Sequence, residues 1–241
     1  MRILIVRHAD PNYEIDGLTE KGTREVALLT KRLCKEKIDH FYCSPLGRAR
    51  ATIAPTLRAL GTEAVICDWL KEFNYSHIQL PYEQNPSGGW DILPEYMNES
   101  EILYSPTEWR EAPIIKGTQK LADYDWVCRE FDALLEKHGY RREGRIYRAE
   151  RPNHDTILLA CHFGLGAVLL SHLMFCSPYS LWQHTCLAPT SVTTAYTEER
   201  RKGIASIRLS AIGDTSHLFE IEPISFSGRF CECFTDDTRH D

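Results

Sequence analysis

Short apolar runs that alternate with helix-forming segments restrict the fold of this chain more than any other feature. The run ILIV at residues 3–6 is apolar and mostly β-branched, which is typical of a buried parallel strand. The segment 19–36 then places apolar residues at helical spacing, with Thr19 as its N-cap. Because parallel strands need a crossover between them, this pattern predicts an α/β three-layer sandwich, a mostly parallel sheet with helices on both faces.

The same alternation continues along the rest of the chain. Strand-like runs occur at 40–44, 63–67, 155–162 and 205–212, and helical patterns at 45–60, 121–139 and 164–175. The basic segment between the helix at 121–139 and the next strand is rich in turn residues and is predicted as a connection. We therefore expect one domain that spans residues 1–241.

The periodicity disappears between about 73 and 117. This stretch is rich in proline and aromatic residues and has neither a strand nor a helix period, so we interpret it as a cap insertion. Two interpretations of its aromatic side chains stay open: they line the entrance to a site, or they only pack the cap. The residues concerned are Tyr82, Trp90, Tyr96 and Trp109.

Charge excludes several classes of partner. The formal net charge is -6 and the isoelectric point is about 5.9, which gives no long-range attraction to nucleic acid or to an anionic membrane surface. The apolar run at the N-terminus is too short for a signal peptide or a membrane span. We expect no nucleic-acid or membrane partner, and an anionic substrate would need a local basic pocket. The sequence does not indicate an oligomeric state.

The nine cysteines are scattered, and several lie in apolar runs that are expected to be core. Reduced, buried thiols are therefore the expectation, and they favour a cytoplasmic protein. Only Cys231 and Cys233 lie close together, and this pair lacks the second pair of ligands that a zinc site needs. We predict no metal site.

Two histidines directly follow two predicted strands. His8 follows the strand at 3–6, with Arg7 beside it, and His162 ends the strand-like run at 155–162. Ligands of open parallel sheets bind beyond the carboxyl ends of the strands, so these side chains can converge there. A single histidine at a strand end is more often structural, and only the joint pattern indicates a site.

Two further charged residues are expected near the same edge. Arg48 lies in the first turn of the helix that follows the strand at 40–44, where a helix N-terminus already favours an anion. Glu72 follows the strand at 63–67 and can bring a carboxyl group to the rim. Arg50 and Arg58 on the same helix as Arg48 are interpreted as a solvated surface.

Five motifs in this order resemble the histidine phosphatase superfamily in its phosphoglycerate-mutase-like branch. They lie at both ends of the chain's α/β core, and the combination is specific, although RHADP and CHFG depart from the commoner forms of the first and last motif. The motifs are IVRHA at 5–9, GLTEKG at 17–22, SPLGRARAT at 44–52, LKE at 70–72 and CHFG at 161–164.

The resemblance implies a role for each matching residue. His8 is the nucleophile that carries the phosphoryl group, Glu72 is the acid, and Asn12 is a further candidate contact to phosphate. Arg7, Arg48 and His162 bind the phosphoryl oxygens, and planar guanidinium groups suit this because they bind phosphate in bidentate fashion. No metal and no cofactor takes part.

The function expected from this pattern is hydrolysis of a small phosphorylated metabolite through a phosphohistidine. Two alternatives remain: a phosphomutase of the same chemistry, and a phosphate- or phosphopeptide-binding module without turnover. One architecture hosts several functions, so the fold alone does not choose among them.

Overall fold

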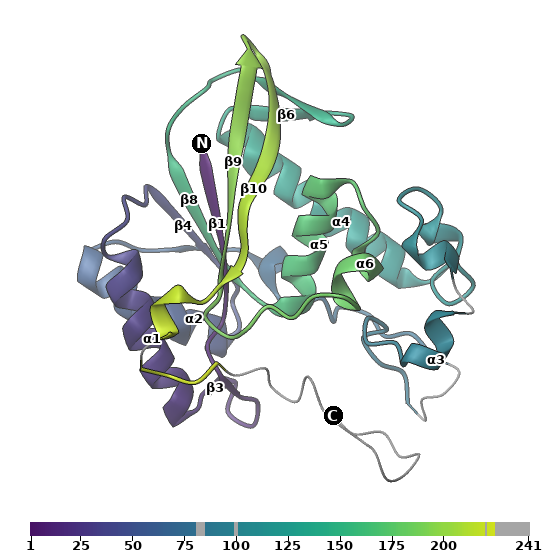
Figure 1. The fold of residues 1–241 in the computed structure, drawn as a ribbon, viewed down its shortest axis with the longest axis horizontal. Coiled ribbons are helices and arrows are strands. Elements are labelled where there is room, and N and C mark those ends of the chain that lie inside the picture. Colours follow the sequence, from purple (N-terminus) through teal and green to yellow (C-terminus); the bar gives the residue numbers. More distant parts are fainter. Residues whose placement is uncertain (81–84, 99–100, 220, 225–241) are drawn as a thin grey trace.

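A computed structural model describes residues 1–80, 85–98, 101–219 and 221–224. Its centre is an eight-stranded sheet in the order β5-β4-β8-β1-β9-β10-β7-β6, shown in Figure 1. The strands are β1 (Arg2–Arg7), β4 (His40–Cys43), β5 (Val65–Ile66), β6 (Tyr140–Glu143), β7 (Ile146–Ala149), β8 (Thr156–Cys161), β9 (Val192–Arg201) and β10 (Ile204–Asp214). A separate two-stranded ladder joins β2 (Pro11–Asn12) and β3 (Gly17–Leu18).

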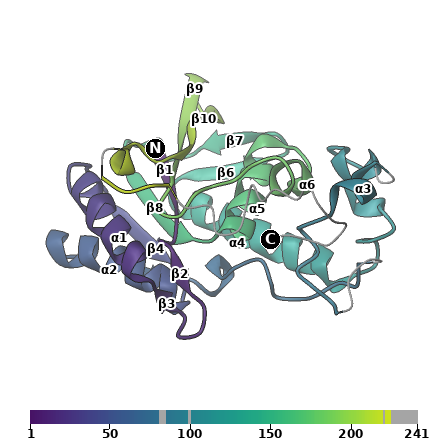
Figure 2. The same ribbon diagram turned by 60° about the horizontal axis from the view of Figure 1, so that its bottom comes forward.

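The helices cover both faces of the sheet (Figure 2). They are α1 (Glu20–Leu33), α2 (Gly47–Leu60), α3 (Pro94–Met97), α4 (Gln119–Lys137), α5 (Phe163–Met174) and α6 (Pro178–Trp182), with single 3₁₀ turns η1 (Asp68–Leu70), η2 (Glu101–Tyr104), η3 (Trp109–Glu111) and η4 (Ser216–Leu218). As predicted, Thr19 caps α1, because its side chain accepts the N–H of Gly22 at 3.0 Å.

Alternation along β1 builds the three layers. Leu4 and Val6 pack with α1 and α2 on one face, and Ile3 and Ile5 pack with α4 and α5 on the other. Successive side chains of a strand point to opposite faces, so a strand buried on both sides has to be apolar throughout. The predicted α/β architecture with helices on both faces is confirmed.

Only half of the sheet is parallel, so the expectation of a mostly parallel sheet needs correction. Strands β5, β4, β8 and β1 run parallel, whereas β9, β10, β7 and β6 continue the sheet in antiparallel fashion. Three of these four strands were not predicted. The hairpin β6–β7 lies in the basic segment expected to be a connection, and β9 ends in the charged run EERR. Their exposed faces are polar, and this hides the strand period.

No strand of the sheet comes from the described part of residues 73–117, which holds α3, η2 and η3. Trp109 is 5% exposed and contacts the rings of Tyr124 and Tyr179, so this side chain packs the interior. Tyr82 lies outside the described residues. The interpretation of this stretch as a cap insertion in a single domain stays a prediction.

The seven cysteines in the described ranges form no disulfide, and Cys231 and Cys233 lie outside those ranges. Among the described residues, no helix is long and apolar enough to cross a membrane.

Candidate active site

His8 and His162 follow two strands that are neighbours in the sheet. β1 pairs with β8 in parallel, with Arg7 opposite Cys161, so the next residue of each strand emerges at the same edge. The two imidazole rings lie 5.0 Å apart between centroids, and both side chains are buried. The structure therefore brings the two predicted histidines together.

The backbone fixes the tautomer of His8. Its Nδ1 lies 2.8 Å from the carbonyl oxygen of Ala9, and a carbonyl can only accept, so Nδ1 carries the proton. In the neutral ring, the lone pair is then on Nε2. Burial, followed by the positive charge of Arg7, lowers the pKa of His8 to about 3. At neutral pH, His8 is an uncharged imidazole with a nucleophilic Nε2.

This lowered pKa predicts a loss of stability in acid. The native pKa of His8 lies below the ordinary 6.5, so between pH 6.5 and about 3 the unfolded chain binds a proton that the native chain does not. Stability that is complete above pH 6.5 is lost as the pH falls. The His8 contribution lost by pH 5 is about 2 kcal/mol.

Urea unfolding of the wild type and of His8→Asn at pH 7 and pH 5 measures this loss. Asparagine can still donate to the Ala9 carbonyl but does not titrate, so the wild type should lose about 2 kcal/mol more than the variant. Equal losses in the two proteins would contradict the assignment of a neutral, buried His8.

His162 is held by Ser44, a residue to which the sequence analysis gave no role. The Nε2 of His162 lies 2.8 Å from the Ser44 hydroxyl, which also accepts the N–H of Leu46 at 3.3 Å. The Nδ1 of His162 is buried without a hydrogen-bond partner among the described residues. Burial, followed by the positive charge of neighbouring residues, lowers the pKa of His162 well below its ordinary value. A buried polar atom without a partner is costly, and a ligand that accepts from it removes that cost.

Arg7 and Arg48 add positive charge to the same edge. Both guanidinium groups lower the pKa values of His8 and His162, which places all four side chains in one electrostatic cluster. Arg7 donates to the carbonyl oxygen of Leu187, and its guanidinium carbon lies 5.8 Å from the centre of the Phe163 ring.

Asp16 orients Arg48, and the sequence gave no signal for it. One carboxylate oxygen of Asp16 accepts from Arg48 Nη1 at 2.6 Å, and the other accepts the N–H of Gly47 at 2.6 Å. Partial burial opposes the ionisation of Asp16, but these donors lower its pKa below the ordinary value. The bridge links the β2–β3 turn to the start of α2. An alignment that shows covariation of positions 16 and 48 is the kind of signal that finds such a pair.

Glu72 lies at the N-terminus of α5. Its Oε1 accepts the backbone N–H of Phe73 at 2.8 Å and that of Leu165, in the first turn of α5, at 2.9 Å. A Cβ at Gly164 would lie 2.8 Å from the same oxygen, so the carboxyl group needs the glycine in CHFG. His162 is the N-cap of α5, so Glu72 lies beside the histidine edge, as predicted from sequence.

Asn12 is not brought into this cluster by any contact that the structure describes. Its Oδ1 accepts the N–H of Glu14 at 3.1 Å, which closes a local turn. Trp90 contacts the edge of the site, because its ring lies 5.8 Å, between centroids, from that of Phe163, the residue after His162. The indole Nε1 of Trp90 is buried without a hydrogen-bond partner in the described part of the chain.

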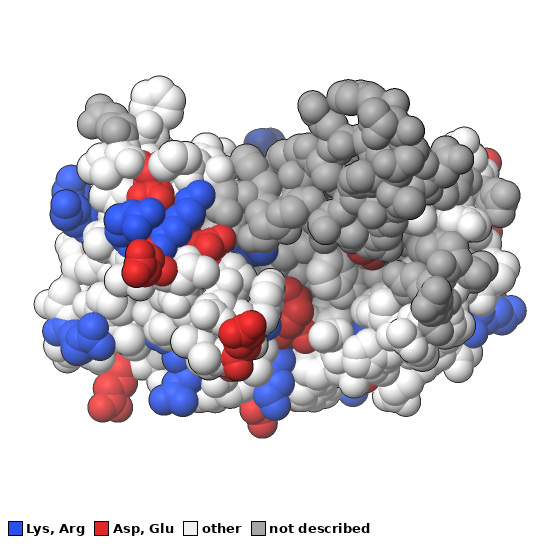
Figure 3. All heavy atoms as spheres, turned by 90° about the horizontal axis from the view of Figure 1, so that it is seen from below, with Lys and Arg blue, Asp and Glu red and all other residues white. Residues whose placement is uncertain are grey.

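Positive charge at this edge is local. Figure 3 views the molecule from the side toward which β1 runs, and the described part of that face carries basic and acidic side chains of both signs, interspersed. On the described part of this face, positive charge beside the two histidines therefore comes from the guanidinium groups of Arg7 and Arg48 and not from a basic surface patch.

Residues 3–98 match the model of the histidine phosphatase superfamily (branch 1). A putative phosphoserine phosphatase 2 from Hydrogenobacter thermophilus is 31% identical over 87 residues, which are 32% of this chain and 43% of that protein. The match thus spans less than half the length of this curated relative.

Two solved structures share the fold over most of their length. A phosphoserine phosphatase from Entamoeba histolytica is similar with a TM-score of 0.59 and 17% identity, over 90% of this chain and 98% of that one. A mycobacterial glucosyl-3-phosphoglycerate phosphatase is similar with a TM-score of 0.56 and 15% identity, over 88% and 98%. Residues 3–98 of this chain are thus similar to the histidine phosphatase superfamily, and the chain as a whole has the fold of these two phosphatase structures.

Proposed function

We propose that this protein is a metal-independent phosphomonoesterase that uses His8 as its nucleophile and hydrolyses a small phosphorylated metabolite. The observation that carries the proposal is the state of His8, a buried neutral imidazole whose Nδ1 donates to Ala9. A neutral imidazole with a free Nε2 lone pair is what attack on phosphorus requires.

The proposed first step transfers the phosphoryl group to His8. Nε2 of His8 forms a bond to phosphorus as the ester P–O bond breaks, and the leaving oxygen takes a proton from Glu72. Arg7 and Arg48 compensate the charge on the equatorial oxygens. His162 donates from Nδ1 when Ser44 donates its hydroxyl proton to Nε2, an arrangement that the 2.8 Å contact supports.

The proposed second step returns the enzyme to its starting state. Glu72 takes a proton from a water molecule that attacks phosphorus, the P–N bond breaks, and inorganic phosphate leaves. The proposed substrate class is small phosphate monoesters. O-phosphoserine and 3-phosphoglycerate are the first substrates to assay, since phosphoserine phosphatases are among the similar proteins and one of them is solved with 3-phosphoglyceric acid bound.

Glu72→Gln should separate substrates by their leaving groups. The amide oxygen of glutamine can still accept the N–H groups of Phe73 and Leu165, so the variant removes the proton and keeps the position. We expect turnover of alkyl phosphates to fall by about 10²–10⁴, and turnover of p-nitrophenyl phosphate, whose leaving group needs little protonation, to fall much less.

The two failures of this prediction have different meanings. Equal losses on both substrates would assign Glu72 a positioning role at the N-terminus of α5. Unchanged turnover on both would mean that another residue is the acid.

Phosphate release should not require a metal. Phosphoryl charge in the proposed mechanism is compensated by guanidinium groups and not by a Lewis acid. The rate of phosphate release after dialysis against EDTA should therefore equal the rate before it. Loss of activity in EDTA that one divalent ion restores would overturn the proposed mechanism.

A release assay with and without a diphosphorylated primer distinguishes the alternatives. Primer-independent release of phosphate supports the phosphatase, and primer-dependent isomerisation supports a phosphomutase. Binding of phosphate esters without either reaction supports a binding module.

A further inference from the structure

Three metal-ligand side chains meet at the opposite edge of the sheet from His8 and His162. His40 is the first residue of β4, Asp155 directly precedes β8, and His138 is the C-cap of α4. Because β4 and β8 are parallel, their starts lie together at one edge and their ends, which lead to His162 and Ser44, lie at the other.

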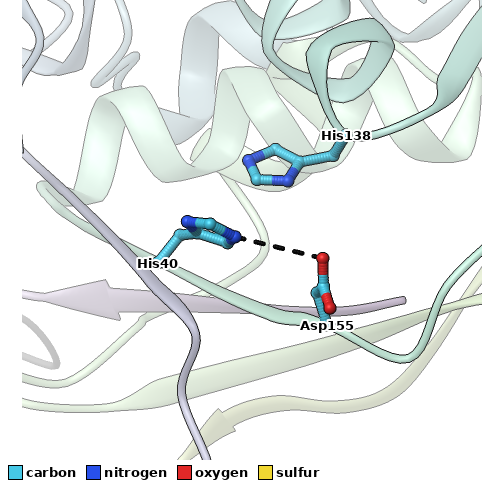
Figure 4. Close-up of side chains that lie close together, drawn as sticks. All are labelled: His40, His138 and Asp155. Carbon is cyan, nitrogen blue, oxygen red and sulfur yellow. Dashed lines mark ion pairs between the residues drawn. The ribbon is translucent and has the colours of Figure 1, made fainter.

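We propose that His40, His138 and Asp155 form a binding site for a divalent transition-metal cation with the ligand preferences of Zn²⁺, separate from the phosphoryl-transfer site. One ligand atom from each of the three side chains lies within 4.8 Å of the other two. Figure 4 shows the two imidazole rings and the carboxylate turned toward a common space.

The distances between these side chains fit ligands around one ion better than side chains that hydrogen-bond to one another directly. The Nε2 of His40 lies 3.9 Å from an oxygen of Asp155, which is too long for a hydrogen bond. Ligands at about 2.0–2.1 Å from a tetrahedral Zn²⁺ lie roughly 3.3 Å from one another. Small rotations of His40 and Asp155 reach that distance, and their side chains, 48% and 41% exposed, are free to make them.

The surroundings of His138 prepare it as a ligand. Its Nε2 lies 2.8 Å from the hydroxyl of Tyr42, so Nδ1 is the nitrogen available to an ion. A histidine that donates its second ring N–H to a fixed acceptor is the usual arrangement at metal sites.

One asparagine connects two of the ligands. Asn153 donates from Nδ2 to the carbonyl oxygen of His138 at 2.8 Å, and its Oδ1 accepts the N–H of Asp155 at 3.1 Å. The end of α4 and the start of β8 are therefore held in register before any ion binds. The C-terminus of a helix also favours positive charge in its last turn, which offsets part of the repulsion from Lys137.

The chemistry of the ligand set indicates the class of ion. Two imidazoles and one carboxylate suit Zn²⁺ and its neighbours, and an all-oxygen ligand set would be needed for Mg²⁺ or Ca²⁺. Three protein ligands leave the fourth position to water. The expected role is structural, because the ion joins α4, β4 and the segment before β8 and lies away from the histidine pair.

Titration of the metal-stripped full chain with Zn²⁺ tests the site. A competing chromogenic chelator should report one bound ion per chain, and saturating Zn²⁺ should raise the Tm. His40→Ala and Asp155→Asn should each weaken binding by about tenfold or more. His154→Ala is the matched control, because His154 is an exposed histidine beside Asp155 that is not part of the cluster, and it should bind like the wild type.

Melting curves without metal establish that the variants fold. We expect both to fold, because the two substituted side chains are partly exposed. Co²⁺ should bind without a thiolate-to-cobalt charge-transfer band, which excludes the cysteines as ligands. Binding in His40→Ala and Asp155→Asn as tight as in the wild type, or no bound ion at all, would overturn the proposal. Phosphate release is measured separately and should not change in these variants.

Discussion

Replacing His8 with alanine should lower turnover by about five orders of magnitude or more. In the proposed mechanism His8 forms the covalent intermediate. His162, the other histidine of the described site, does not replace it, because the Nε2 of His162 is engaged in a hydrogen bond with the hydroxyl of Ser44. Wild-type enzyme quenched during turnover should carry an acid-labile, base-stable phosphoryl group on His8, and the variant should carry none.

The control for this variant is His154→Ala, which removes an exposed imidazole and should leave turnover unchanged. The substitution leaves a cavity next to β1. Circular dichroism and a melting curve therefore have to establish that His8→Ala folds. A stable phosphoryl group on a serine or an aspartate would exclude His8 as the nucleophile.

Arg48→Ala and His162→Ala should each lower kcat/KM by about 10²–10³, the usual cost of one donor to a developing oxyanion. Arg48→Lys should recover only part of the loss, because a lysine lacks the planar guanidinium group that donates to Asp16 and, in the proposed mechanism, to phosphoryl oxygens as well. Asp16→Asn should have a smaller effect, since its amide oxygen still accepts from Gly47 or Arg48.

Arg50→Ala is the matched control for Arg48→Ala. Arg50 lies two residues further along α2, is exposed, and is interpreted from the sequence as part of a solvated surface. Steady-state kinetics on one substrate compare the two variants directly. Similar rates in Arg48→Ala and Arg50→Ala would remove Arg48 from the site.

The parallel half of the sheet could be predicted because its strands are buried on both faces. Burial on both faces demands an unbroken apolar run, as in β1 and β8, and such runs are visible in a single sequence. Strands β6, β7 and β9 have one polar or solvent-exposed face or a charged end, and their sequences resemble those of surface loops. The half-antiparallel sheet was therefore not predictable from local pattern.

The candidate site divides in the same way. The placement of His8, His162, Arg7 and Arg48 near one edge of the sheet could be predicted because each lies within a motif at a strand end or in the first turn of a helix. Their roles stay predictions. Asp16 and Ser44 contact residues of the site that lie far away in the chain, and the local sequence gives no sign of these contacts. Trp90 was one of the aromatic residues with two open interpretations, and its contact with Phe163 is seen only in the tertiary structure.

The proposed metal site shows most clearly what the spacing of residues along the sequence cannot predict. The sequence predicted no metal because the one close pair, Cys231 and Cys233, lacks a second pair of ligands, whereas His40, His138 and Asp155 come from three separate elements. By itself, the sequence determined the α/β class, the placement of His8, His162, Arg7 and Arg48 near one edge of the sheet, and the family resemblance, since these depend on local periodicity and short motifs. Only the tertiary structure decided the tautomer of His8, the partners of Arg48 and His162 and the meeting of His40 with His138 and Asp155, because each depends on distances between atoms that are remote along the chain.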